Sequence, residues 1–167
     1  LLLGVQQGDV SVDQALLKLK QKPFEDLGYA KVDLHRKLRQ GAGEVIYGEG
    51  KTAEQIAGIL SGMLENGQKT VLITRMDEKK AEEVRKTHPI FYYPASRIGI
   101  LGTMAKPWGM GRIVVATGGT SDIPVAEEAV LTARFLGNDV VPLYDVGVSG
   151  IHRLLQHSEE LMDASVV

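Results

Sequence analysis

The sequence predicts an α/β fold made of two small units joined by a glycine-rich linker. Two apolar runs rich in β-branched residues, at 70–74 and 113–116, are typical of strands covered on both faces. Both runs are followed by a turn and then by apolar residues at helical spacing. Strands that alternate with helices along the chain are characteristic of α/β proteins with parallel sheets.

A helical segment over residues 1–22 is predicted to precede the first unit. The apolar side chains of residues 11–20 fall on one stripe of a helix, which Ser11 or Asp9 can cap. We expect this stripe to dock on the rest of the chain or on another subunit.

Residues 23–101 are predicted to form a small α/β domain, which begins with an irregular stretch over 23–30. Val32 and Leu34 alternate with polar side chains, and this pattern predicts a short strand. A basic cluster follows at 35–39, and its simplest interpretation is a solvated face. The alternative is that Asp33, His35 and Arg36 face a ligand.

The next predicted elements of this domain are a strand over 44–50 and a helix. The strand ends in a glycine turn that carries Glu49, and Lys51 stands at the start of the helix. Thr52 and Gln55 have the spacing of a capping box. The buried stripe of this helix is predicted to consist of Ile56, Leu60, Met63 and Leu64.

The domain is predicted to continue with the strand at 70–74, a second helix and a hairpin. Arg75 stands at the end of this strand, where ligands collect in open α/β sheets. Asp77 is predicted to cap a helix that runs to about residue 86. Residues 91–93 and 97–101 are predicted to pair as a hairpin.

Residues 102–111, GTMAKPWGMG, are the predicted linker, because three glycines and a proline occur there without periodicity. We expect Trp108 to pin this linker to a domain rather than to stack on a base.

Residues 112–167 are predicted to form the second unit, with strands at 113–116 and 139–144 and helices from about 124 to 136 and from 151 to about 161. Pro142 cannot donate to a sheet ladder, so it predicts an edge or a starting position for the second strand. The inward side of the first helix is predicted to consist of Ala126, Ala129, Val130, Ala133 and Leu136.

The turn after the first strand of this unit is a candidate phosphate site. Gly118 and Gly119 allow a tight turn and a close approach of a ligand to the backbone. Thr120 and Ser121 add hydroxyls beside the free N–H groups of a helix N-terminus, which suits a phosphate. The carboxylate of Asp122 would repel a phosphate, so its expected partner is a ribose hydroxyl. A plain strand–helix turn is the alternative on spacing alone.

The second loop is expected at the same sheet edge, because a right-handed crossover connects the two parallel strands. It offers Asp145, Ser149, His152 and Arg153. Arginine can bind a phosphate bidentately, and histidine can move a proton near neutral pH. His88 and His157 have no phosphate-type turn or other candidate site residues near them in the predicted fold, so they are predicted to be surface residues.

Composition excludes several other classes of site. The net charge of -2 argues against binding to nucleic acid through bulk positive charge. The absence of cysteine excludes disulfides and cysteine-based metal sites, and the four histidines lack the spacing of zinc ligands, so no metal site is predicted. With no long apolar span and no signal peptide, we expect a cytoplasmic protein without a membrane partner.

Both ends of the sequence lead us to expect a fragment of a longer protein. The chain begins at Leu1 without an initiator methionine, and Ala164 to Val167 have the character of a strand that has just begun.

The stretches ATGGTSDIPVAEEA and LYDVGVSGIHRLL together resemble the LarB family of nickel-pincer cofactor biosynthesis. The stretch FEDLGYAKVDLHRKLRQGAGEVIYGEGKTAEQIA is similar to the N-terminal region of that family, which the aminoimidazole ribonucleotide carboxylases (PurE-like enzymes) of purine synthesis do not have. The resemblance covers about residues 24–157. It implies a truncated, PurE-like three-layer domain with a parallel, flavodoxin-like sheet after the small N-terminal domain.

The resemblance also implies a reaction. LarB-like enzymes carboxylate C5 of the pyridinium of nicotinic acid adenine dinucleotide and cleave its phosphoanhydride, which releases AMP. Their co-substrate is CO2, no tightly bound cofactor is implied, and Mg²⁺ is left open. The related carboxylases are octamers, so a homo-oligomer that binds a small nucleotide is expected.

The family's roles carry over to matching positions. Gly118, Gly119, Thr120 and Ser121 match the phosphate turn, and Asp122 matches the ribose carboxylate. His152 and Arg153 resemble the His-Arg pair of the purine carboxylases, although Ser149-Gly150-Ile151 before them is one residue longer. The implied catalytic residues are His152 and Asp145. In the second unit, the implied substrate contacts also include Ser149 and Arg153. In the N-terminal domain, the residues assigned to the dinucleotide or to the contact between the domains are Asp33, His35, Arg36, Glu49, Lys51 and Arg75.

One departure from the family concerns the nucleophile. In LarB-like enzymes a cysteine in a later segment adds to the ring, and these residues include no cysteine. We therefore expect this chain alone to bind weakly and not to catalyse. The alternatives are an aminoimidazole ribonucleotide carboxylase, which the N-terminal region disfavours, and a nucleotide-binding module without chemistry.

Overall fold

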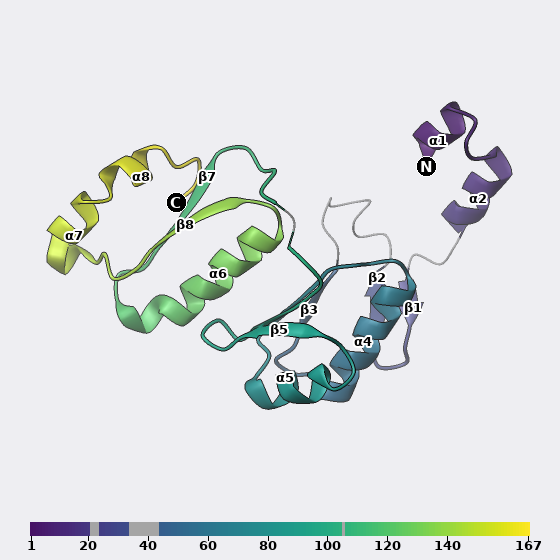
Figure 1. Cartoon of the computed structure of the whole chain (residues 1–167), viewed down its shortest axis with the longest axis horizontal. Helices are drawn as coiled ribbons and strands as arrows, with labels where there is room; N and C mark the ends of the chain where they lie inside the picture. The colour runs from purple at the N-terminus through teal and green to yellow at the C-terminus, as the bar shows by residue number, and fades with distance from the viewer. Residues whose placement is uncertain (21–23, 34–43, 105) are drawn as a thin grey trace.

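The computed structural model describes residues 1–20, 24–33, 44–104 and 106–167 (Figure 1). It shows an α/β protein, which confirms the predicted class. In chain order the elements are α1 (Leu2–Gln6), α2 (Val12–Lys20), β1 (Phe24–Asp26), β2 (Lys31–Asp33), β3 (Val45–Tyr47), α4 (Ala53–Glu65), β4 (Val71–Thr74), α5 (Glu78–Arg85), β5 (Ile90–Tyr93), β6 (Ile98–Leu101), β7 (Arg112–Ala116), the short 3₁₀ helix η1 (Thr120–Asp122), α6 (Ile123–Phe135), β8 (Asp139–Leu143), the 3₁₀ helix η2 (Val148–Gly150), α7 (Ile151–Leu155) and α8 (Ser158–Met162).

A four-stranded sheet with the order β3-β4-β6-β5 forms the centre of the first unit. β3 and β4 are parallel, whereas β6 pairs antiparallel with both of its neighbours. Side chains alternate between the two faces of a strand, so Val71 and Ile73 join the core beneath α4 and α5 while Leu72 faces the other side. The predicted capping box begins α4, where Thr52 Oγ1 accepts from the Gln55 N–H at 3.2 Å. On α4, Leu64 is exposed and Ile59 is buried, which corrects one member of the predicted stripe.

Helix α6 covers the opposite face of this sheet, although it belongs to the second unit. Leu131 is 5% exposed and packs against Leu72, Ile98 and Ile100. α6 also lies against β7 and β8 (Figure 1). The helix therefore has two buried sides. Ala126 and Val130 are buried as predicted, but Ala129 and Leu136 are exposed, and Leu131 was missed because the prediction allowed for a single buried stripe.

The second unit has the parallel pair β7–β8, in which Arg112 is opposite Asp139 and Ala116 is opposite Leu143. Val166 pairs in parallel with Ile113 on the other side of β7. Within the described residues, β8 has no partner on its other side, so Pro142 occupies an edge strand as expected. The predicted helix over 151–161 is instead two helices, α7 and α8, because the backbone of His157 leaves the helical region (φ -107°, ψ 21°).

The stretch predicted to be irregular at 23–30 contains strand β1, which pairs antiparallel with β2. Gly28 (φ 80°) makes the turn between them, and its N–H donates to Asp26 Oδ1 at 2.9 Å. Strand β1 has only three residues, which is too short for the sequence to show the alternation of apolar and polar side chains that predicts a strand.

His88 is buried at 8% exposure, so its prediction as a surface residue was wrong. Its Nε2 lies 3.1 Å from Ser61 Oγ on α4, and its Nδ1 lies 2.9 Å from Thr87 Oγ1. The chain turns back at the end of α5 and places this ring beneath α4.

In the described part of the chain, no helix combines the length and the apolar character needed to cross a membrane.

Leu131→Ala is expected to lower the free energy of unfolding by about 2–5 kcal/mol, because it leaves a cavity between α6 and the four-stranded sheet. Val125→Ala is the matched control, since Val125 lies on the same helix and is 65% exposed. Urea unfolding of both variants measures the difference. Equal losses would show that the contact between α6 and this sheet does not form.

Candidate functional site

The two candidate loops of the second unit leave the same end of the β7–β8 pair. Thr117 donates its N–H to the Leu143 carbonyl at 3.0 Å, and its own carbonyl accepts from Val146 N–H at 2.9 Å. The buried Thr117 Oγ1 also accepts from the N–H of Asp145 at 3.0 Å. One threonine therefore holds the start of both loops. Thr117 was not among the predicted site residues, although its sequence signal is a polar residue directly after a buried strand.

The loops touch through glycines. A Cβ atom built on Gly147 would lie 2.3 Å from the Gly118 carbonyl oxygen, so only glycine permits this approach. Nothing lies within 4 Å of the corresponding position on Gly118. Gly147 is a second residue that sequence reasoning missed.

The glycine turn (residues 118–122) presents its polar side chains outward. Thr120, Ser121 and Asp122 are exposed, and none of them forms a side-chain hydrogen bond to another described residue. Helix α6 follows directly, with Pro124 in its first turn as predicted. The turn therefore offers two hydroxyls and one carboxylate to a ligand, with their hydrogen-bonding capacity unused.

The second loop (residues 145–153) is arranged around an ion pair. Asp145 adopts a left-handed backbone (φ 58°), and its Oδ2 accepts from Arg153 Nη1. The guanidinium also lies over Gly150, where a Cβ atom would be 2.8 Å from Nε. Since a guanidinium has five N–H donors, the pair with Asp145 leaves others for a phosphate. Ser149 on η2 and His152 on α7 are both exposed.

Tyr144 joins the end of β8 to α6. Its hydroxyl donates to Glu127 Oε1, and burial followed by this hydrogen bond raises the pKa of Tyr144 to about 12. Tyr144 is therefore a protonated donor at neutral pH.

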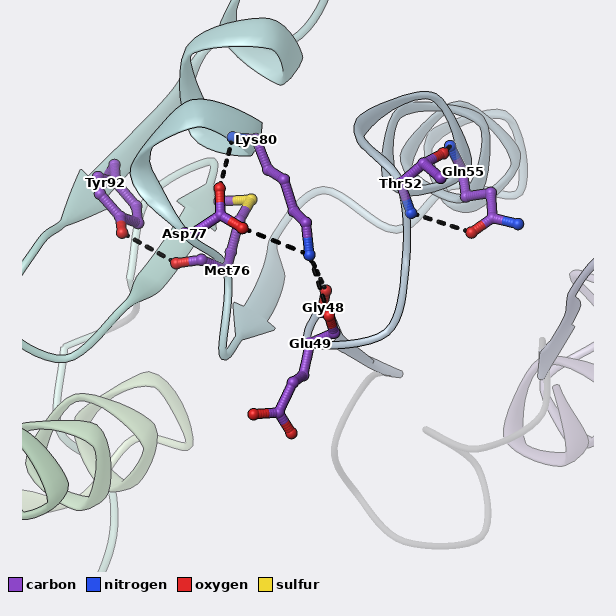
Figure 2. Close-up of polar contacts among 8 residues, drawn as sticks. All are labelled: Gly48, Glu49, Thr52, Gln55, Met76, Asp77, Lys80 and Tyr92. Atoms are coloured by element: carbon purple, nitrogen blue, oxygen red, sulfur yellow. Dashed lines mark hydrogen bonds and ion pairs between the residues drawn. The ribbon is translucent and has the colours of Figure 1, made fainter.

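In the N-terminal unit, Lys80 holds the loop between β3 and α4 (Figure 2). Its Nζ donates to the carbonyls of Gly48 at 3.2 Å and Glu49 at 3.0 Å, and lies 3.5 Å from Asp77 Oδ2. Asp77 caps α5 by accepting from the Lys80 N–H at 2.9 Å, and this bond is the main cause that lowers the pKa of Asp77. Lys51 completes the loop through its N–H, which donates to the Gly48 carbonyl at 3.3 Å.

The Glu49 side chain points away from Lys80 (Figure 2) and accepts from the Tyr47 hydroxyl. This hydrogen bond, followed by the charges of Arg75 and Arg97, holds the pKa of Glu49 below its usual value. The same bond raises the pKa of Tyr47.

Arg75 is engaged between the two units rather than free. Its Nε donates to both carboxylate oxygens of Glu128 on α6, at 2.9 and 2.8 Å. The bond to Glu128 is the main cause that raises the pKa of Arg75. Of the two roles expected for this residue, the structure shows a contact between the units.

The remaining predicted residues are not brought to the loops of the second unit. Asp33 ends β2, which lies far along the long axis of the molecule from those loops (Figure 1). His35 and Arg36 lie outside the described residues.

Lys80→Met is expected to destabilise the protein by about 1–2 kcal/mol, because it removes a charged donor from two carbonyls. Lys79→Met is the control, since its neighbour Lys79 is exposed. Urea unfolding at neutral pH is the measurement, and a Lys80→Met loss no larger than that of Lys79→Met would contradict the assigned role.

Gly147→Ala is expected to cost about 1–3 kcal/mol of stability, because its methyl group meets the Gly118 carbonyl oxygen. Gly118→Ala has open space at the added methyl group and is expected to stay within about 0.5 kcal/mol of the wild type. Thermal unfolding compares the two. Full tolerance of alanine at 147 would mean that the loops do not touch there.

Residues 24–103 match the family described as LarB/PurE-like N-terminal domain. An uncharacterized protein of Methanocaldococcus jannaschii is 34% identical over 175 aligned residues, which cover 99% of this chain and 68% of that protein. The chain therefore belongs to the LarB/PurE-like family.

Proposed function

We propose that the full-length protein carboxylates C5 of the pyridinium ring of nicotinic acid adenine dinucleotide with CO2 and hydrolyses its phosphoanhydride, in the biosynthesis of the nickel-pincer cofactor. Membership of the LarB/PurE-like family supports a carboxylase-type enzyme. The particular substrate and the hydrolysis are our proposal.

The observation that carries this proposal is the meeting of the two loops at one end of β7 and β8. Thr117 joins them through the N–H of Asp145, and Gly147 lies against Gly118. A single nucleotide placed there could meet the hydroxyls of the glycine turn and the basic side chains of the second loop.

Each group has a role in the proposed binding. Backbone N–H groups and the hydroxyls of Thr120 and Ser121 bind a phosphate at the start of α6. Asp122 accepts from a ribose hydroxyl. Arg153, held by Asp145, gives its remaining donors to the phosphate.

The ring chemistry requires a nucleophile, because a pyridinium is too electron-poor to attack CO2. Addition of the nucleophile turns the ring into an enamine, whose C5 forms the new bond to CO2. A base then removes the C5 proton and the nucleophile leaves with its electron pair, while water cleaves the phosphoanhydride and AMP departs. We assign the proton transfer to His152, which is exposed at the end of the second loop, on α7. None of these 167 residues is a cysteine, so the nucleophile is proposed to come from outside them.

The test is incubation of the full-length protein with the dinucleotide and bicarbonate, followed by mass spectrometry. We expect a ring product that carries one additional carboxylate, together with one equivalent of AMP. His152→Ala is expected to lower kcat by about 100-fold or more, as for loss of a general acid–base group.

His157→Ala is the control, since that imidazole lies 3.4 Å from Glu160 on α8 and has no assigned role in the reaction. The 167-residue chain alone is expected to give no turnover. Carboxylation of aminoimidazole ribonucleotide in place of the dinucleotide would refute the proposal, as would binding without any carboxylation by the full-length protein.

A further inference from the structure

The glycine turn depends on its neighbours for its position. The side chains of Thr120, Ser121 and Asp122 form no hydrogen bond to another described residue, and no side chain caps η1 or α6. The turn is therefore held by its backbone, by the contact of Gly118 with Gly147 and by the elements at its two ends, β7 and α6.

Helix α6 is in turn anchored to the N-terminal unit at two points. Leu131 packs against Leu72, Ile98 and Ile100 of the four-stranded sheet. About one turn closer to the start of the helix, Glu128 receives both hydrogen bonds from Arg75. An apolar contact resists separation but tolerates sliding, whereas the directional, charge-assisted bond from the Arg75 Nε–H, which both Glu128 oxygens share, resists a shift of the helix along its axis.

The backbone of Arg75 is held in an uncommon conformation. Arg75 has a left-handed conformation (φ 55°) directly after β4. Such a conformation is unfavourable for a residue with a Cβ atom, and it persists where the surroundings determine it. The side chain is 41% exposed and that of Glu128 is 21% exposed, so the pair is partly withdrawn from water.

We propose that Arg75 is a positioning residue: by holding Glu128 it fixes α6, and it thereby places the glycine turn where the nucleotide binds. Glu128 follows Asp122 by six residues, or about 9 Å along the helix. A shift of α6 at Glu128 is therefore transmitted to the turn by a rigid element. The effect on binding rests on the proposed function, whereas the effect on the turn itself does not.

Hydrogen exchange of the full-length protein without ligand tests the structural part. In Arg75→Ala, we expect amides 118–122 to exchange about fivefold faster or more, the lower end of typical coupling between linked sites. Peptides from α4 serve as the internal reference for global unfolding. The charge-swapped variant Arg75→Glu/Glu128→Arg is expected to restore slow exchange.

Arg97→Ala is the matched control. Arg97 has the same φ of 55° and lies at the same end of the sheet, where its carbonyl accepts from Met76 N–H. Its guanidinium forms no hydrogen bond or ion pair with another described residue. We expect no change in exchange at the turn.

Steady-state kinetics with the dinucleotide tests the consequence for the ligand. Arg75→Ala is expected to raise KM about tenfold with kcat within about twofold, and the charge swap to restore KM. Three results would overturn the proposal. The first is unchanged exchange at 118–122 in Arg75→Ala, and the second is an equal change in Arg97→Ala. The third is faster exchange in Arg75→Ala with an unchanged KM. Faster exchange in Arg75→Ala together with no dinucleotide binding by the wild type would reject the proposed function and leave the role of Arg75 in the turn intact.

Discussion

The packing of α6 between two sheets is the contact on which the arrangement of the molecule depends. Ala126 and Val130 are buried on this helix, and Leu131 is buried against the four-stranded sheet. Full burial of a valine or leucine side chain contributes about 1.5–3 kcal/mol. Because the helix is shared, the end of β4 comes to lie beside its first half, where Arg75 can reach Glu128.

Both units organise their loops with a similar device at the ends of parallel strands. In the first unit, Lys80 reaches from α5 to the carbonyls of Gly48 and Glu49. In the second, Thr117 accepts from the N–H of Asp145. Each device satisfies main-chain groups that would otherwise need water. The side chains on the loops remain available, and a loop that is already ordered loses less entropy when it binds a ligand.

The electrostatics of the two units differ in a way that bears on function. Around β3 and β4, Tyr47, Glu49, Arg75 and Glu128 are joined in neighbouring pairs. In the second unit, only Arg153 among the predicted ligand contacts is tied to a carboxylate, and the hydroxyls of the glycine turn form no side-chain bonds within the described chain. This contrast favours the second unit as the place of the proposed nucleotide site, and the first unit as the support that orients it.

Much of the local structure was determined by the sequence alone. Runs of β-branched residues predicted β4 and β7, and the spacing of Thr52 and Gln55 predicted the start of α4, because these signals act between residues close in the chain. The meeting of the two loops at one edge also followed from the handedness of the crossover between parallel strands.

Only the tertiary structure decided which side chains are buried against distant layers. Leu131 and His88 are buried, and Leu64 is exposed, for reasons that lie in elements far along the chain. The pair Arg75–Glu128 joins residues 53 positions apart. Helical periodicity describes one apolar stripe, and it cannot show that a second sheet will cover another side of the same helix.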